Sequence, residues 1–269
     1  MVKAAGAAGA ATFRQRFADG DLLYGTFLKT PTSHATEILA IAGYNFVVVD
    51  QEHAPFGRES TDAVMLACHA YGIAGIVRVP DSSASSILSA LDCGAAGVLV
   101  PHVDSPAKAR EVVAACRYAG GHRGFSNTTR AGGFGEASIA DHVADQDRDA
   151  CVVAMIEDPH ALEAIDEIVA TEGVDGFFIG RGDLTVAYGE ASPAAASVKE
   201  ATDRIITAAR GAGKPVCVLT GSQEDARDLA SKGASAFMMA SDQGFLRQAA
   251  KAALADISSC VGEARNKNV

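Results

Sequence analysis

The sequence lacks the cysteine pattern of a disulfide-bonded or zinc-stabilised protein. Its six cysteines are scattered, and no two of them form a C-x-x-C pair. Several lie in apolar surroundings, such as Cys217 in the run VCVL, which is typical of buried free thiols. Because free thiols persist in reducing compartments, we expect a cytoplasmic protein without disulfides.

The sequence also lacks a long apolar run and an excess of positive charge. No stretch reaches the roughly 18 apolar residues of a membrane-spanning helix. The Ala- and Gly-rich residues 1–12 lack a leucine-type apolar core, which leaves a signal peptide as a weak alternative. The chain has 23 basic and 33 acidic residues, a net charge of −10. Nucleic acids and anionic membranes attract basic surfaces, so we expect neither as a partner and expect a small-molecule ligand instead.

What the sequence contains is an alternation of short β-rich runs with longer helical runs. Eight runs are predicted to be strands, and most helical runs end on a glycine, which supplies a left-handed helix stop. The predicted strands are residues 22–28, 46–49, 75–79, 97–100, 152–156, 176–179, 216–219 and 236–239. Eight parallel βα units close a single α/β domain, the (β/α)₈ barrel. We place this domain at residues 21–258, after a flexible segment and short helix in residues 1–20 and before a tail at residues 259–269.

Residues 118–135 interrupt the alternation. Their sequence, YAGGHRGFSNTTRAGGFG, is too rich in glycine for a helix. We expect a long loop over the barrel mouth, and a disordered insertion is the alternative.

Polar residues follow most of the predicted strands. Asp50, Glu52 and His53 come directly after the second strand, in FVVVDQEHAP. The other strand-end candidates are Arg78, His102, Glu157, Asp158, Asp183, Ser241 and Asp242. The C-terminal ends of barrel strands build the ligand site. Such polar groups are costly to bury without partners, so their joint presence favours a functional site over a mere cluster of caps and salt bridges.

Individual residues suggest chemistry but leave alternatives open. Glu157 and Asp183 are hard oxygen ligands that suit Mg²⁺, Mn²⁺ or Co²⁺, or else they pair with Arg78 or Arg181. Arg78, inside the apolar run GIVRV, is either a buried ion-pair member or an oxyanion clamp. The turn around Gly182 offers N–H groups to a carboxylate, or is simply a strand-to-helix turn.

Asp92, His102 and His122 also leave alternatives open. Asp92 either orients an imidazole across an interface or is a solvated helix-end charge, and His102 and His122 are possible substrate contacts. We identify no lysine at a strand end, so a Schiff-base mechanism has no evident nucleophile.

The chain resembles the HpcH/HpaI aldolase family, which includes 4-hydroxy-2-oxoheptanedioate aldolase and 2-dehydro-3-deoxyglucarate aldolase. The resemblance runs from about residue 25 to residue 257 and keeps the order of the motifs GTFL, AGYNFVVVDQEHAP, VRVP, LDCGAAGVLVPHV, RYAGGHRGF, MIEDPHALEAIDEI, EGVDGFFIGRGDL and MMASDQGFL. It implies a barrel whose last helix is exchanged between subunits, in a hexamer built from three dimers.

The resemblance also implies roles for particular residues. Glu157 and Asp183 would bind a divalent metal ion, Mg²⁺, Mn²⁺ or Co²⁺, and Arg78 would hold the keto or enolate oxygen. His53 would transfer protons, with Asp50 nearby and supported by Asp92 of the partner subunit. The N–H groups of Gly182 and Asp183 would bind the substrate carboxylate.

The implied reaction is the cleavage or formation of 4-hydroxy-2-oxo acids, which yields pyruvate or a related 2-oxo acid and an aldehyde. One alternative is that the same site acts on oxaloacetate, by decarboxylation or by a citrate-forming condensation, and another is a non-catalytic scaffold with a decayed site. Met155, Arg181, Gly182 and Gln51 depart from the commonest family pattern. We expect His102 and Arg181 to contact a more hydroxylated or more acidic ligand.

Overall fold

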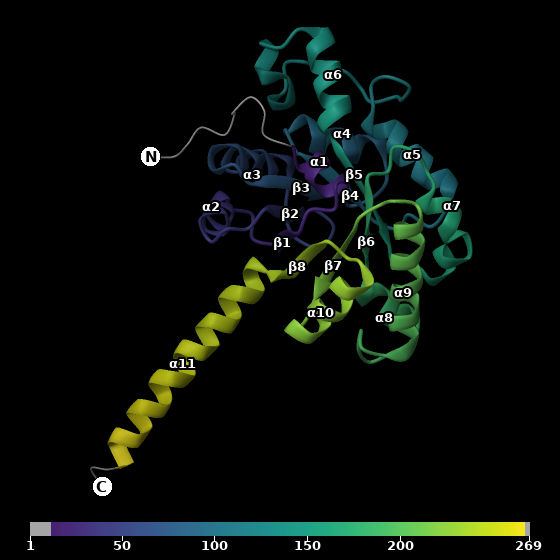
Figure 1. Cartoon of the computed structure of the whole chain (residues 1–269). Coiled ribbons are helices and arrows are strands. Elements are labelled where there is room, and N and C mark those ends of the chain that lie inside the picture. Colours follow the sequence, from purple (N-terminus) through teal and green to yellow (C-terminus); the bar gives the residue numbers. More distant parts are fainter. Residues whose placement is uncertain (1–11, 267–269) are drawn as a thin grey trace.

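The computed structural model describes residues 12–266, which form a closed barrel of eight parallel strands surrounded by helices (Figure 1). The strands are β1 (Leu23–Leu28), β2 (Phe46–Asp50), β3 (Ala74–Arg78), β4 (Gly97–Val100), β5 (Cys151–Ile156), β6 (Gly176–Ile179), β7 (Val216–Thr220) and β8 (Ala236–Ser241). Each strand pairs with the next, and β8 pairs with β1. The predicted (β/α)₈ barrel is confirmed.

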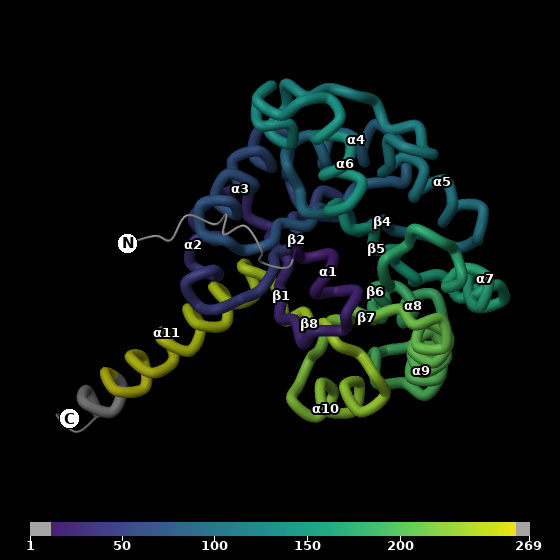
Figure 2. Tube along the Cα trace, turned by 45° about the horizontal axis from the view of Figure 1, so that its top comes forward, coloured from purple at the N-terminus to yellow at the C-terminus, as the bar shows by residue number. Residues whose placement is uncertain are grey.

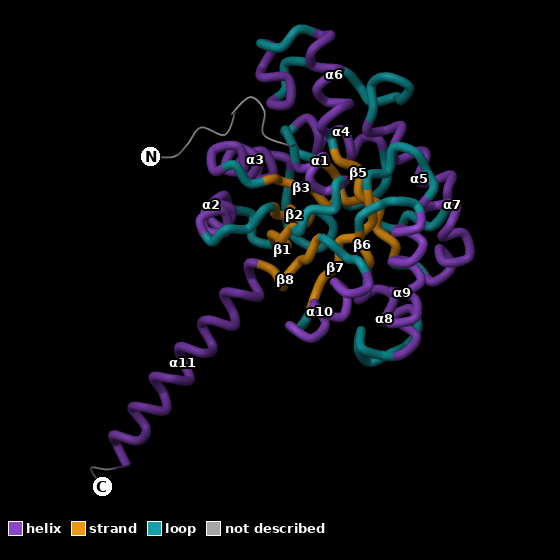
Figure 3. The backbone as a smooth tube through the Cα atoms, viewed as in Figure 1, coloured by secondary structure: helices purple, strands orange, loops and turns teal. Residues whose placement is uncertain are grey.

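The helices lie outside the strands, which Figure 3 shows in orange at the centre of the molecule. They are α1 (Phe13–Ala18), α2 (Ser33–Ile41), α3 (Arg58–Tyr71), α4 (Ala84–Asp92), α5 (Pro106–Cys116), α6 (Ile139–Asp149), α7 (Ile165–Val169), α8 (Arg181–Ala187), α9 (Ala196–Gly211), α10 (Gln223–Lys232) and α11 (Asp242–Asn266), with the 3₁₀ helices η1 (Arg130–Gly135) and η2 (Pro159–Ala164). The sequence did not predict α6, whose composition is strongly polar, or α8, which begins in the predicted turn.

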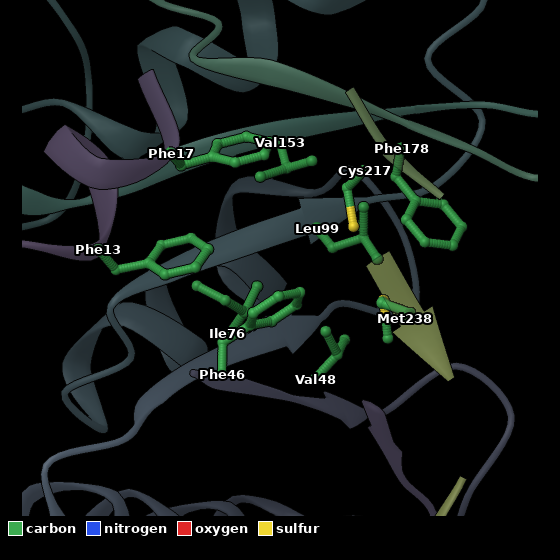
Figure 4. Close-up of a pocket in the computed structure, with 10 residues that line it drawn as sticks. All are labelled: Phe13, Phe17, Phe46, Val48, Ile76, Leu99, Val153, Phe178, Cys217 and Met238. Atoms are coloured by element: carbon green, nitrogen blue, oxygen red, sulfur yellow. The ribbon is translucent and has the colours of Figure 1, made fainter. Parts of the chain in front are cut away.

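The strands are buried on both faces, which explains their continuous apolar runs. In β2, Val47 and Val49 pack among the residues that face the helices, whereas Phe46 and Val48 pack inside the barrel. Phe13 and Phe17 of α1 project from one end of the barrel toward these inner residues, around an apolar cavity of about 20 Å³ (Figure 4). Helix α1 therefore closes the end where the strands begin, and leaves the end where they finish for the site.

Helix α11 projects away from the barrel (Figures 1 and 2). It continues to Asn266, through most of residues 259–269, which were predicted to be a tail. Its start is fastened to the barrel, because the Asp242 carboxylate accepts hydrogen bonds from the backbone N–H groups of Lys29 and Thr30, at 2.8 and 3.0 Å. Within the described residues, no helix is long and apolar enough to cross a membrane.

Residues 118–135 do not cover the barrel mouth of their own chain. Arg130 binds Asp62 of α3 through two hydrogen bonds of 2.9 and 2.6 Å, and η1 packs against α4 and α6. The predicted loop is thus a packed outer segment with one short 3₁₀ turn. Ion pairs between its side chains and the neighbouring helices hold this segment in place. The glycine content of the segment did not indicate these ion pairs.

The cysteines are free thiols in the part of the chain that the structure describes. Five are buried, and Cys260 of α11 is exposed. The prediction of buried free thiols is therefore confirmed at every position except the last.

Candidate functional site

The C-terminal ends of β1, β2 and β3 bring together a buried ion cluster. The carboxylate of Asp50 is fully buried and accepts hydrogen bonds from Arg78 Nε at 3.0 Å and Nη2 at 2.7 Å, and from the N–H of His53 at 3.0 Å. Burial would raise the pKa of Asp50, but the hydrogen bonds and charge of Arg78 outweigh it and lower the pKa. Asp50 is therefore an ionised anchor that fixes Arg78.

Lys29 belongs to the same cluster, and the statement that no lysine occupies a strand end is wrong. Lys29 directly follows β1, and its ammonium lies 3.0 Å from Asp50 Oδ2. The expected strand ran to residue 28, so the next residue had to lie at the mouth. The signal that identifies Lys29 in the sequence is its position directly after a predicted strand.

Arg78 points its remaining nitrogen toward Glu52. Nη1 lies 3.3 Å from Glu52 Oε2, and the guanidinium stands over the Phe27 ring at 4.7 Å. Glu52 Oε2 is buried without a hydrogen-bond partner among the described residues, and lies 3.6 Å from Nε2 of the exposed His53. Arg78 is thus a buried ion-pair member whose guanidinium also borders the mouth cavity, so both interpretations of this residue are compatible with its position.

Glu157 and Asp183 come from the neighbouring ends of β5 and β6. Glu157 is 3% exposed, whereas Asp183 is exposed in the first turn of α8. Burial, together with hydrogen bonding and repulsion from Asp183, raises the pKa of Glu157 to about 7, although the N–H of His102 acts in the opposite direction. Arg78 pairs with Asp50 and Arg181 pairs with Asp225, so neither neutralises the two carboxylates.

Gly180 makes this approach of β5 and β6 possible. A Cβ at this position would lie 2.4 Å from Glu157 Cβ, closer than folded chains allow. The following residues begin α8, where the N–H groups of the first turn lack intrahelical acceptors. The N–H groups of Gly182 and Asp183 therefore stand beside the two carboxylates, where a ligand oxygen can accept from them.

His102 is held in an uncommon backbone conformation at the end of β4. Its φ is 53°, its N–H donates to Glu157 Oε1 at 2.7 Å, and its Nδ1 lies 3.0 Å from Asp158 Oδ2. Burial would lower the pKa of His102, but the hydrogen bond to Asp158 and the negative charges of Glu157 and Asp158 outweigh it and raise the pKa. Left-handed backbone is costly for a residue with a side chain, so the surrounding contacts must enforce it.

Asp92 lies away from this cluster within the chain. Its carboxylate is buried at the end of α4 and pairs with Arg123 at 3.4 Å and Arg58 at 3.9 Å. It is therefore not a solvated helix-end charge. The described chain does not bring it to His53, and its expected contact across a subunit boundary stays a prediction. His122 pairs with Glu111 on the surface, at 2.8 Å, and is absent from the cavity wall.

An open cavity of about 1070 Å³ lies at the barrel mouth. Its wall includes Lys29, Arg78, Met155, the 180–183 turn and residues after β7 and β8. It is a pocket with cations on one side and carboxylates on another, which can hold a small acidic molecule in a fixed orientation.

The model of the HpcH/HpaI aldolase/citrate lyase family matches residues 23–249. The chain belongs to this family. It is 39% identical over 209 residues to hydroxypyruvate/pyruvate aldolase of Roseovarius nubinhibens, covering 75% of this chain and 80% of the relative. It is 35% identical over 224 residues to 5-keto-4-deoxy-D-glucarate aldolase of Shigella dysenteriae, covering 82% and 86%.

Solved structures of the family have the same fold. A HpcH/HpaI aldolase/citrate lyase family protein from Burkholderia cenocepacia has a TM-score of 0.86 and 28% identity, covering 91% of this chain and 98% of that one. The citrate synthase SbnG has a TM-score of 0.85 and 29% identity, covering 93% and 99%.

The departures from the family pattern occupy different places around the site. Met155 lines the cavity, whereas the Gln51 amide donates to Thr61 at 2.9 Å and is occupied there. Arg181 is buried and donates to Asp225 at 2.8 Å. The guanidinium of Arg181 thus holds α10, but Arg181 also lines the cavity, so its expected contact with a ligand stays a prediction.

Proposed function

We propose that this protein is a divalent-metal-dependent aldolase that cleaves or forms 4-hydroxy-2-oxo acids. The family and its aldolase relatives make the chain a carbon–carbon lyase. The observation that carries the proposal is the pair of carboxylates Glu157 and Asp183 beside the Arg78 cluster. Asp183 of this pair and Arg78 both line one cavity, so a cation-binding group and an oxyanion-binding group border it.

The donor set fits a hard divalent cation. Glu157 and Asp183 repel each other although His102 Nδ1 lies 3.4 Å from Glu157 Oε1, and a proton or a metal ion between the two carboxylates relieves this repulsion. No cluster of three or more His, Cys, Asp or Glu side chains that could hold a metal occurs among the described residues. Such an ion would be held by Glu157 and Asp183, with substrate and water as its other ligands, as Mg²⁺ sites commonly are. Mg²⁺, Mn²⁺ and Co²⁺ all suit this oxygen set.

The residues of the chain divide the work in the proposed reaction. The bound metal would act as a Lewis acid that stabilises negative charge developing on the oxo acid. Arg78, fixed by Asp50, binds the keto oxygen and stabilises it as an enolate oxygen when the C3–C4 bond breaks. The N–H groups of Gly182 and Asp183 bind the carboxylate, and His102 borders the substrate beside Glu157.

His53 accepts the proton of the 4-hydroxyl group in this proposal. Its Nε2 lies 3.6 Å from Glu52 Oε2, and its side chain is about half exposed, so a ligand can reach the imidazole. In the reverse direction His53 returns this proton to the new hydroxyl group. We propose that Asp92 of the partner subunit orients this imidazole, as in the assembly that the family resemblance implies.

The proposed assembly is a homo-oligomer that exchanges α11. The helix has exposed apolar side chains at Leu246, Leu254, Ile257 and Val261, all more than half exposed. Their spacing puts them on one face of a helix, and this face has no covering element within the described chain. A second copy supplies the matching surface in the hexamer that we propose.

A second candidate function uses the same site on oxaloacetate. The structural similarity to the citrate synthase SbnG favours keeping this alternative. Arg78 and the carboxylate pair serve an oxaloacetate-derived enolate as well as a pyruvate enolate, so the two reactions differ in what happens to the enolate.

The test is pyruvate release from a 4-hydroxy-2-oxo acid by the wild type and by Glu157→Gln, in EDTA and after Mn²⁺ is restored, with oxaloacetate in parallel. We expect Mn²⁺-dependent release by the wild type and a loss of at least 100-fold in the variant. Asp166→Asn, on the outer helix α7, is the matched control and should keep wild-type rates. Metal-independent release would contradict the proposal, and turnover of oxaloacetate alone would favour the second candidate.

A further inference from the structure

Lys29 is a cation at the barrel mouth, and it has no role in the reaction proposed above. It follows β1, its side chain is 29% exposed, and it lines the cavity together with Arg78. Its partner Asp50 is already bound by two nitrogens of Arg78 and by the N–H of His53. Asp50 thus remains an ion-pair partner of Arg78 without Lys29, so fixing Arg78 does not account for the lysine.

The ammonium of Lys29 retains donors that can bind a ligand. An ammonium has three N–H groups, and Asp50 Oδ2 accepts one of them at 3.0 Å. No second partner for Lys29 Nζ exists among the described residues. Two donors of a fixed, partly buried cation therefore remain beside the cavity.

A second cation lines the same cavity from the adjacent element. Arg247 lies in the second turn of α11, next in space to β1 because Asp242 at the start of α11 binds the N–H groups of Lys29 and Thr30. Arg247 has no ion-pair partner among the described residues. The hydroxyl-bearing residues Thr220 and Ser241 also line the cavity there. This side of the mouth presents donors for an anion.

The position of these cations distinguishes the two ends of the substrate. Glu157, Asp183 and the N–H groups of α8 lie at the ends of β5 and β6, whereas Lys29 and Arg247 lie at the ends of β1 and β8. In the proposed function the oxo acid extends from the first side to Arg78, which shares Asp50 Oδ2 with Lys29. A group bound by Lys29 then belongs to the other end of the molecule, the part that leaves as the aldehyde.

We infer that Lys29, assisted by Arg247, binds a carboxylate on the aldehyde product or acceptor and so selects acidic aldehydes. This inference rests on the proposed aldolase function and deepens it. A hydrogen bond between charged groups contributes more than one between neutral groups. Lys29 thereby serves as a residue that determines specificity.

The experiment compares two aldehydes of the same chain length in aldol addition to pyruvate, 4-oxobutanoate and butanal. We expect Lys29→Met to lower the ratio of kcat/KM for 4-oxobutanoate over butanal by about 10- to 100-fold. Lys29→Arg should keep most of the ratio. Arg247→Met, which leaves Asp50 untouched, should lower it by a smaller factor, and Lys108→Met on α5 should leave it unchanged.

Proton exchange of the pyruvate methyl group in D₂O, followed by NMR, reports on the enolate half of the reaction without any aldehyde. Pyruvate proton exchange by the wild type and the variants, together with a lowered kcat/KM ratio of 4-oxobutanoate over butanal in the variants, would support the inference. Pyruvate proton exchange with an unchanged kcat/KM ratio, or with an equal loss of kcat/KM for both aldehydes, would overturn the inference and leave the aldolase proposal intact. A wild type that neither exchanges pyruvate protons nor forms an aldol would overturn both.

Discussion

The replacement Arg78→Met tests how the buried ion cluster holds the site together. Arg78 is 5% exposed and contacts Asp50 through Nε and Nη2, at 3.0 and 2.7 Å. Methionine fills much of the volume but leaves the buried Asp50 carboxylate with only Lys29 and the N–H of His53 as donors. Removing one partner of a buried ion pair typically costs about 3–5 kcal/mol, because the other charge stays buried. We expect a loss of this size in the free energy of unfolding at pH 7.

The pH dependence has a definite sign. Because the folded pKa of Asp50 is lowered, its stabilisation is present above the unfolded value of about 3.9 and is lost as the pH falls through the folded pKa. In the variant, burial without Arg78 raises the pKa of Asp50, so the carboxylate can take up a proton. The difference between wild type and Arg78→Met should therefore be largest near neutral pH and shrink as the pH approaches 4.

Urea unfolding followed by circular dichroism at pH 7 and pH 5 measures this difference, since the chain has no tryptophan for fluorescence. The double variant with Asp50→Asn completes a mutant cycle and should recover about half of the stability or more. Aldol activity should stay at least 100-fold reduced, because the double variant still lacks Arg78, the oxyanion donor of the proposed mechanism. A loss below about 1 kcal/mol, or no recovery in the double variant, would refute the assignment of Arg78 as partner of a buried charge.

Two further predictions concern the carboxylate pair and the last helix. The pKa of Glu157 is raised to about 7 without metal, so its protonated form stabilises the fold below the unfolded pKa, and this contribution is lost as the pH rises through 7. In EDTA, Glu157→Gln should therefore abolish this part of the fall in melting temperature between pH 5 and 8. An unchanged dependence of the melting temperature on pH would contradict the raised pKa of Glu157. Replacing Leu254 and Ile257 of α11 by glutamate should convert the proposed hexamer to a smaller species in sedimentation velocity. An unchanged sedimentation coefficient would exclude that face of α11 from the assembly.

The barrel was predictable because its signals are local. A strand buried on both faces must be apolar throughout, so runs such as FVVVD and CVVAMI stand out, and the glycines after most helices mark where the next strand begins. The positions of Asp50, Glu157 and Asp183 at the mouth follow directly, because a residue after a strand of known direction must lie at that end. Helix α8 was missed because it is only seven residues long and starts inside a turn sequence.

The pairing of charges was not predictable, because it depends on contacts between distant segments. Both Arg78 and Arg181 were candidates to neutralise Glu157 and Asp183 or to contact the ligand. The sequence contains no signal that Asp225, 44 residues away, takes Arg181, or that Asp50 takes Arg78. Which cation remains available for a ligand is decided only after these pairs form. Lys29, whose ammonium contacts Asp50 and which lines the cavity, is a cation that these pairs leave available to the proposed ligand.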